Sequence, residues 1–152
     1  MKLGTSGLVE VQGEGIMSGI SAEGNVVICN SARVISWGYR SAILGKNVSV
    51  GDNAVVNAKS GFVALYGTDV VTINGNAEVN CSMASSAHLT TTVALTARES
   101  VTIGGNTKVK TAGGSFGIFL DDAILITGNA NVCISECRDG VARAAKAASE
   151  HI

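Results

Sequence analysis

The sequence predicts an all-β protein, a solenoid in which short strands wind into stacked coils. One phrase recurs along the chain: VTINGNAEVN begins at Val71, VTIGGNTKVK at Val101 and ILITGNANVC at Ile124. Apolar residues alternate on both sides of the central Gly-Asn, which is the pattern of β-strands. The phrases recur at intervals within the range of about 20 to 50 residues that is typical of solenoids.

Each phrase predicts two strands joined by a corner. In the first phrase Val71 and Ile73 alternate before the Gly-Asn pair, and Ala77 and Val79 alternate after it. A glycine at the corner allows the positive φ that a sharp change of direction requires. A third apolar stretch precedes each phrase and predicts a third strand in every coil, in which the superposed residues are Val63, Val93 and Phe116, and then Leu65, Leu95 and Ile118.

A single coil of three strands cannot bury its inner face. The coils therefore have to stack, with each Val or Ile about 4.8 Å from its counterpart in the next layer. The pattern predicts about five to six coils in residues 1–140. Residues 141–152 are rich in alanine and poor in strand formers, which predicts a helical cap or a frayed tail.

The asparagine of each phrase marks the repeat. We expect stacked asparagines to form a ladder in which each side-chain amide bonds the next one along the axis. Their separations are 28, 23, 30 and 23 residues, and this alternation predicts that a longer coil and a shorter coil were duplicated together. The anchors are Asn25, Asn53, Asn76, Asn106 and Asn129.

Composition narrows the classes of function. The 152 residues suit one domain, and because 46% are hydrophobic but only 4% aromatic, small and β-branched side chains have to fill the core. The net charge of −1, without a basic run, argues against nucleic acid or anionic lipid as a partner. No segment has the pattern of a secretory signal or the length of a membrane span. The four cysteines lack a metal-ligand spacing and are expected to be buried free thiols: Cys29, Cys81, Cys133 and Cys137.

The stretch VTIGGNTKVKTAGGSFGIFLDDAILITGNANV resembles the glycine- and asparagine-rich repeats of bacterial extracellular proteins described as carbohydrate-binding-domain-containing. The resemblance covers roughly residues 24–134. It implies a right-handed parallel β-helix, a carbohydrate ligand and a location outside the cell or on its surface. The rival is a left-handed hexapeptide helix, because Leu44, Val50 and Val56 fall six residues apart. That run lasts for two steps only, and coils of about 18 residues do not fit the separations.

Three aromatic residues are the candidate glycan ligands: Trp37, Tyr39 and Tyr66. Aromatic rings on an exposed face can stack against the apolar side of a pyranose. On one continuous strand, Trp37 and Tyr39 would lie on the same side and Arg40 on the other. The alternative is that the rings plug the wider end of the rod.

Alignment of the coils on their strands places four charged residues in one column, two residues before successive strands: Lys46, Asp69, Glu99 and Asp122. Carboxylates stacked at about 4.8 Å repel one another unless a cation offsets their charge. Asp69, Glu99 and Asp122 are therefore a candidate Ca²⁺ site, and the alternative is a solvated corner. A second outward column is polar and could face a polymer or another protein: Ser49, Thr72 and Thr102, with Leu125 at its end.

No catalytic residue can be assigned from the sequence, and His88, an isolated loop histidine, is not expected to act as a general base. The sequence therefore favours a non-catalytic repeat module that binds glycans or serves as a spacer in a bacterial surface or secreted protein. Two alternatives come from other classes. One is a reduced polysaccharide-degrading enzyme like a pectate lyase, and the other is a scaffold whose exposed coil ends associate end to end.

Overall fold

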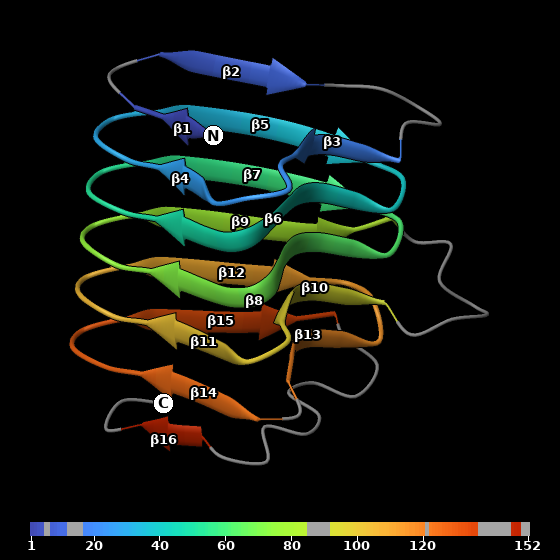
Figure 1. Cartoon of the computed structure of the whole chain (residues 1–152). Coiled ribbons are helices and arrows are strands. Elements are labelled where there is room, and N and C mark those ends of the chain that lie inside the picture. Colours follow the sequence, from blue (N-terminus) through green and yellow to red (C-terminus); the bar gives the residue numbers. More distant parts are fainter. Residues whose placement is uncertain (5–6, 12–16, 85–91, 121, 137–146, 150–152) are drawn as a thin grey trace.

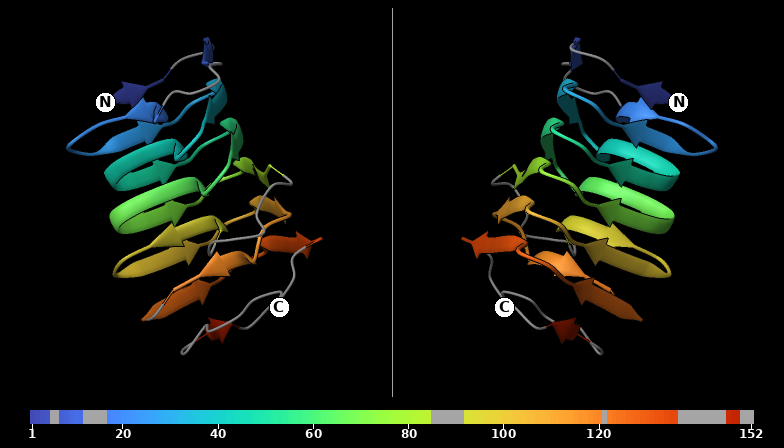
Figure 2. Two further views of the ribbon diagram at one scale, coloured as in Figure 1. Left: turned by 90° about the vertical axis from the view of Figure 1, so that its right-hand side faces the viewer. Right: turned by 90° about the vertical axis from the view of Figure 1, so that its left-hand side faces the viewer.

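The structure, a computed structural model, is a right-handed parallel β-helix of about five turns (Figure 1). It describes residues 1–4, 7–11, 17–84, 92–120, 122–136 and 147–149. In Figure 1 the strands of the front sheet run to the left and those of the back sheet run to the right while the chain descends, which is the right-handed sense. The side views in Figure 2 show the same layers stacked along one axis. The predicted fold class is confirmed.

All the strands pair in parallel. The back sheet holds β2 (Leu8–Val11), β5 (Arg33–Gly38), β7 (Val55–Ser60), β9 (Glu78–Met83), β12 (Lys108–Ala112) and β15 (Asn131–Ser135). The front sheet holds β1 (Lys2–Leu3), β4 (Val26–Ile28), β6 (Ser41–Val50), β8 (Val63–Ile73), β11 (Ser100–Ile103), β14 (Ala123–Ile126) and β16 (Ala147–Ser149).

Three more strands complete the third side of the coils: β3 (Ser18–Ser21), β10 (Val93–Ala97) and β13 (Phe116–Phe119). They stack with the first halves of β6 and β8, which are long enough to run from this side into the front sheet. We call this side the third face. Each complete coil thus has three strand segments, and Leu65, Leu95 and Ile118 pair in register as predicted.

The core is a set of columns in which each buried side chain sits on its counterpart in the next layer. The isoleucine column of the repeated phrase is confirmed, because Ile73 pairs with Ile103 and Ile103 with Ile126, and all three are buried. A second column faces it from the back sheet and is fully buried: Val34, Val56, Val79 and Val109. Stacking in register therefore removes the inner face of each coil from water.

The corners after the front strands need left-handed backbone, and the sequence supplies residues that tolerate it. Gly75 and Gly105 have φ of 71°, and Asn30 and Asp52 reach 59° and 56° at equivalent positions of earlier coils. A Cβ on Gly105 would lie 2.5 Å from the carbonyl oxygen of Gly75 in the layer before. Glycine is therefore required there both by the backbone conformation and by the close approach of the layers.

The asparagine ladder beside these corners is confirmed for four of its five predicted members. The amide nitrogen of each residue donates to the amide oxygen in the previous layer: Asn76 to Asn53 at 3.1 Å, Asn106 to Asn76 at 3.2 Å and Asn129 to Asn106 at 3.1 Å. These bonds join layers at the outer edge of the rod, where the backbone turns.

The fifth anchor, Asn25, was assigned to the wrong position. It lies at the start of the front strand, where Asn47 donates to it at 2.9 Å, and Asn30 takes the left-handed corner position. Because Val26, Val48, Val71, Val101 and Ile124 are equivalent, the coils are 22, 23, 30 and 23 residues long. The predicted alternation of long and short coils is therefore wrong, and one coil carries an insertion.

The C-terminal segment and the cysteines were predicted with partial success. Within residues 141–152 the structure describes only β16, which is a strand paired with β14, so the predicted helix is wrong for these three residues. Cys81 is a buried free thiol as predicted, whereas the free thiols of Cys29 and Cys133 are half-buried and exposed. Cys137 and His88 lie outside the described residues.

We predict that Asn106→Ala destabilises the fold by about 1 to 2 kcal/mol, because it removes one ladder bond on each side. Asn53→Ala is the matched control, since Asn53 makes a single ladder bond and is exposed in the same way. Urea unfolding of both variants measures the difference. Equal losses of stability in the two variants would contradict a stabilising contribution from the second ladder bond of Asn106.

A second prediction concerns alkaline pH. Burial raises the pKa of the Cys81 thiol from 9.0 to about 12, so the folded chain keeps this proton while the unfolded chain releases it near pH 9.0. The fold therefore loses stability as pH rises from 9.0 towards 12, by about 2 kcal/mol at about pH 10.5. Urea unfolding at about pH 8 and about pH 10.5 should show this loss in the wild type and a smaller loss in Cys81→Ala. The same loss in both proteins would contradict it.

Candidate functional site

All six aromatic residues of the chain lie outside the core. The chain has one Trp, two Tyr and three Phe, and none of them is among the buried core residues. The interior of a flattened coil is only about as wide as two facing layers of side chains, and Val, Ile, Leu and Ala fill it. The rings are therefore on the surface, where packing of the coil does not require them.

Five of these six rings gather on the third face. Four of them, Tyr39, Phe62, Tyr66 and Phe119, line one hollow of about 940 Å³, and Phe116 stacks on Phe119 with ring centroids 5.2 Å apart. We call this hollow the axial groove. Its other lining includes Leu44, Thr68, Thr96, Arg40 and Arg98.

Register explains why the groove runs along the helix axis. One outward column of the third face is formed, layer by layer, by Leu44, Tyr66, Thr96 and Phe119. Each member lies one residue after a buried side chain of the core column, such as Leu65 or Ile118. The floor of the groove therefore crosses four successive layers.

Ring contacts hold the upper end of the groove in place. Tyr39 and Phe62 meet edge to face, with centroids 5.3 Å apart and an interplanar angle of 76°. Tyr39 is nevertheless 57% exposed, so most of its ring is available to a ligand. At the lower end the hydroxyl of Thr96 donates to the carbonyl oxygen of Phe119 at 2.6 Å, which leaves the threonine oxygen free to accept a hydrogen bond.

The charge of the groove is positive. Arg40 and Arg98 are both exposed and line it, and no Asp or Glu is among its described lining residues. Neither guanidinium forms an ion pair within the described part of the chain, where the ion pair found is Lys46 with Asp69 at 3.6 Å. Both arginines are therefore available to bind acceptor groups of a ligand.

The structure separates Trp37 from the two tyrosines. Strand β5 ends at Gly38, and the chain turns the corner through Tyr39 and Arg40 before β6 begins at Ser41. Trp37 therefore lies on the back sheet, and Tyr39 and Arg40 together line the axial groove. The prediction that Trp37 and Tyr39 share a side, with Arg40 opposite, is wrong because it assumed one continuous strand. Neither ring plugs the end of the rod.

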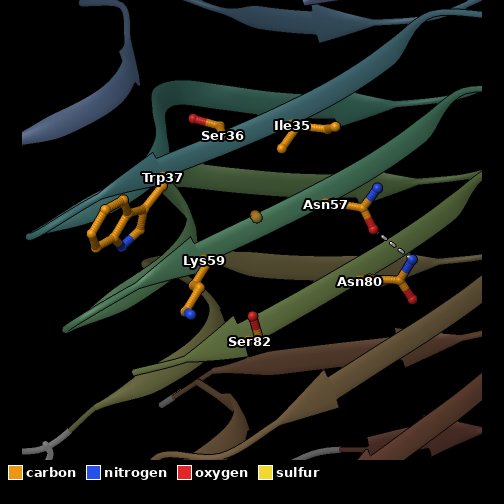
Figure 3. Close-up of a pocket in the computed structure, with 8 residues that line it drawn as sticks. Ile35, Ser36, Trp37, Asn57, Lys59, Asn80 and Ser82 are labelled. Atoms are coloured by element: carbon orange, nitrogen blue, oxygen red, sulfur yellow. Dashed lines mark hydrogen bonds between the residues drawn. The ribbon is translucent and has the colours of Figure 1, made fainter. Parts of the chain in front are cut away.

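Trp37 belongs to a smaller hollow of about 410 Å³ on the outer face of the back sheet, which we call the Trp37 pocket (Figure 3). Two columns line it. One runs from Trp37 through Lys59 to Ser82, and the other runs from Ile35 through Asn57 to Asn80. No lining residue is shared with the axial groove.

The predicted charged column follows the third face where β8 and β11 enter the front sheet. Lys46 pairs with Asp69, and the backbone N–H of Glu99 donates to the carbonyl oxygen of Asp69 at 2.8 Å. Asp122 follows in the next layer, before Ala123, which pairs with Ser100. Among the described residues, no three His, Cys, Asp or Glu side chains form a group that could hold a metal ion. Calcium binding at Asp69, Glu99 and Asp122 stays a prediction.

The polar outward column of the front sheet has the predicted register. Ser49 pairs with Thr72, Thr72 with Thr102, and Thr102 with Leu125, which is 40% exposed. This column contributes no residue to either hollow. Binding of a polymer or another protein by this face stays a prediction.

Sequence reasoning missed Phe62, Phe119, Arg40 and Arg98 as groove residues. Phe119 could have been found from the sequence. The superposition of Leu65 with Ile118 places the next residues, Tyr66 and Phe119, in one column. The arginines and Phe62 lie at corners or beside them, where strand parity does not predict direction.

Comparison with protein-family models, with curated proteins and with solved structures gave no match for this chain. The part of the chain that the structure describes contains no helix with the length and apolar character that a membrane crossing requires. The two hollows and their side chains are therefore the features of this chain that point to a function.

Proposed function

We propose that this protein is a non-catalytic glycan-binding module of a bacterial surface or secreted protein, and that the axial groove holds the glycan. The observation that carries the proposal is the gathering of five of the six aromatic rings on one outer face, around one hollow. A pyranose presents an apolar face that packs on such rings, and its hydroxyl groups bond polar side chains at the rim. The resemblance of the repeats to bacterial extracellular carbohydrate-binding proteins supports the ligand class and the location.

The direction and length of the groove favour an extended chain of sugars over a single one. The column from Leu44 to Phe119 spans three steps between layers, which is roughly 14 Å. About three sugar units linked end to end cover that length. The glycan then lies parallel to the helix axis, with Tyr66 beneath its middle.

The polar groups of the groove favour glycans that carry acidic or sulfated units. Arg40 and Arg98 supply fork-shaped donors that match carboxylate and sulfate oxygens in pairs. The described lining has no Asp, Glu or His, so the pair of carboxylates that glycoside hydrolysis uses is not among these residues. This lining supports a binding function for the groove.

We predict that Tyr66→Ala weakens glycan binding about tenfold, because it removes the ring at the centre of the groove. An array of plant and microbial glycans finds the ligand, and calorimetry with oligomers of one to six units measures affinity. Tyr66→Phe keeps the ring and should bind as the wild type does. Leu125→Ala removes an exposed apolar side chain from another face and should change nothing.

The length dependence is a separate check of the same proposal. Affinity should rise up to about three units and then level off, as expected for a groove of roughly 14 Å. A chain that binds no glycan on the array, or whose binding is unchanged in Tyr66→Ala, contradicts the assignment of the groove.

A further inference from the structure

We infer that the Trp37 pocket is a second glycan site, so that one molecule can hold two glycan chains at once. The inference rests on the proposed function for the class of ligand. The site itself is separate, because it lies on the back sheet and shares no lining residue with the axial groove. At about 410 Å³ it lies near the lower end of the size range of ligand sites and is less than half as large as the groove.

Trp37 supplies the apolar wall of this pocket. It is the single tryptophan of the chain, and it sits half-buried at the end of β5. Lys59 follows it one layer further along the axis, in direct register, and Ser82 comes one layer after Lys59. Figure 3 shows Trp37 and Lys59 at one end of the pocket and the two asparagines at the other.

The two asparagines supply one hydrogen-bond donor group and one acceptor group that no described residue uses. Asn80 donates its amide N–H groups to Oδ1 of Asn57 at 3.0 Å and to Oε1 of Glu78 at 3.2 Å. These two bonds use the nitrogen of Asn80 and the oxygen of Asn57. The nitrogen of Asn57 and the oxygen of Asn80 have no hydrogen-bond partner among the described residues. One donor and one acceptor therefore remain for the hydroxyl groups of a ligand.

Lys59 adds a charge that nothing in the described structure neutralises. Its side chain is exposed and forms no ion pair among the described residues. An ammonium group donates well to a sugar hydroxyl and better to a carboxylate.

The occupant that satisfies all of these groups is one hexopyranose unit of a glycan. Its apolar face packs on the indole of Trp37, two hydroxyl groups bond Asn57 and Asn80, and a third hydroxyl or a carboxylate bonds Lys59. The corner from Gly38 to Arg40 separates this pocket from the axial groove. Both sites can therefore be filled together, and the rod then bridges two glycan chains.

The single tryptophan makes the test specific to this pocket. We would titrate the full chain with cello-, chito- and galacturono-trisaccharides and follow tryptophan emission, excited where tyrosine does not absorb. Calorimetry on the same samples reports all binding and the stoichiometry. The expected result is a saturable change of emission with at least one trisaccharide and about two ligands bound per chain.

Variants of the two sites show which site produces the change of tryptophan emission. Tyr66→Ala should keep the emission change and weaken one of the two calorimetric binding events about tenfold. Asn57→Ala and Lys59→Met should each weaken the emission change about tenfold and keep binding in the groove. Lys59 is exposed, so Lys59→Met keeps the test valid even if Asn57→Ala disturbs the sheet.

Two outcomes overturn the inference, and they differ in what they say of the groove. The first is calorimetric binding without any change of tryptophan emission, or an emission change that disappears in Tyr66→Ala and persists in Lys59→Met. Either result contradicts the second site and is compatible with glycan binding in the groove. The second is the absence of binding by both readouts with all three trisaccharides, which contradicts the second site. If the glycan array also gives no signal, the proposed function is contradicted as well.

Discussion

The structure depends on one constraint, which is that each buried side chain must match the one at the same position in the next layer. The layers lie about 4.8 Å apart, so a column of unequal or misplaced side chains would leave voids or overlaps along the whole core. Ile73, Ile103 and Ile126 meet the constraint inside the coil, and the amides of Asn76 and Asn106 meet it at the corner. The surface columns inherit the same register.

Matching in a thin interior also decides what the surface can do. Two facing sheets leave room for Val, Ile, Leu and Ala, so a large ring gains nothing by pointing inward. The rings therefore lie outside without any cost to the core, and strand register or a corner of the coil sets the position of each ring. On the third face that register brings Tyr66 and Phe119 into one column and makes a groove that runs with the axis.

The two hollows lie where regularity is interrupted. The chain turns sharply between β5 and β6, and a Cβ on Gly38 would overlap the carbonyl oxygen of Ser41. That turn sends Trp37 to the back sheet and Tyr39 to the third face. The pairing of β6 with β8 shifts between Gly45 and Asn47, beside the column that carries Leu44 and Tyr66. Repetition thus builds the rod, and its local breaks help decide which side chains line the two hollows.

Most of the fold could be predicted from the sequence, because each layer places the same kinds of side chain at the same positions and the sequence pattern therefore repeats. Alternation at Val71 and Ile73 indicates strands, Gly75 and Gly105 mark corners, and the recurrence of the phrase requires stacking. The Asn25 assignment was wrong because Asn also occurs at the start of the front strand, where it makes its own bond to Asn47.

The candidate site could be predicted only in its residue types. Trp37, Tyr39 and Tyr66 could be named as candidate ligand-binding rings, but strand parity cannot show where a strand ends, so it placed Trp37 beside Tyr39. Only the tertiary structure decided that Tyr39 joins Phe62 and Phe119 in one groove and that Trp37 faces Asn57 and Lys59 in another pocket. The physical reason is that stacking brings together residues from different coils, and the direction of each corner is set by backbone packing between layers.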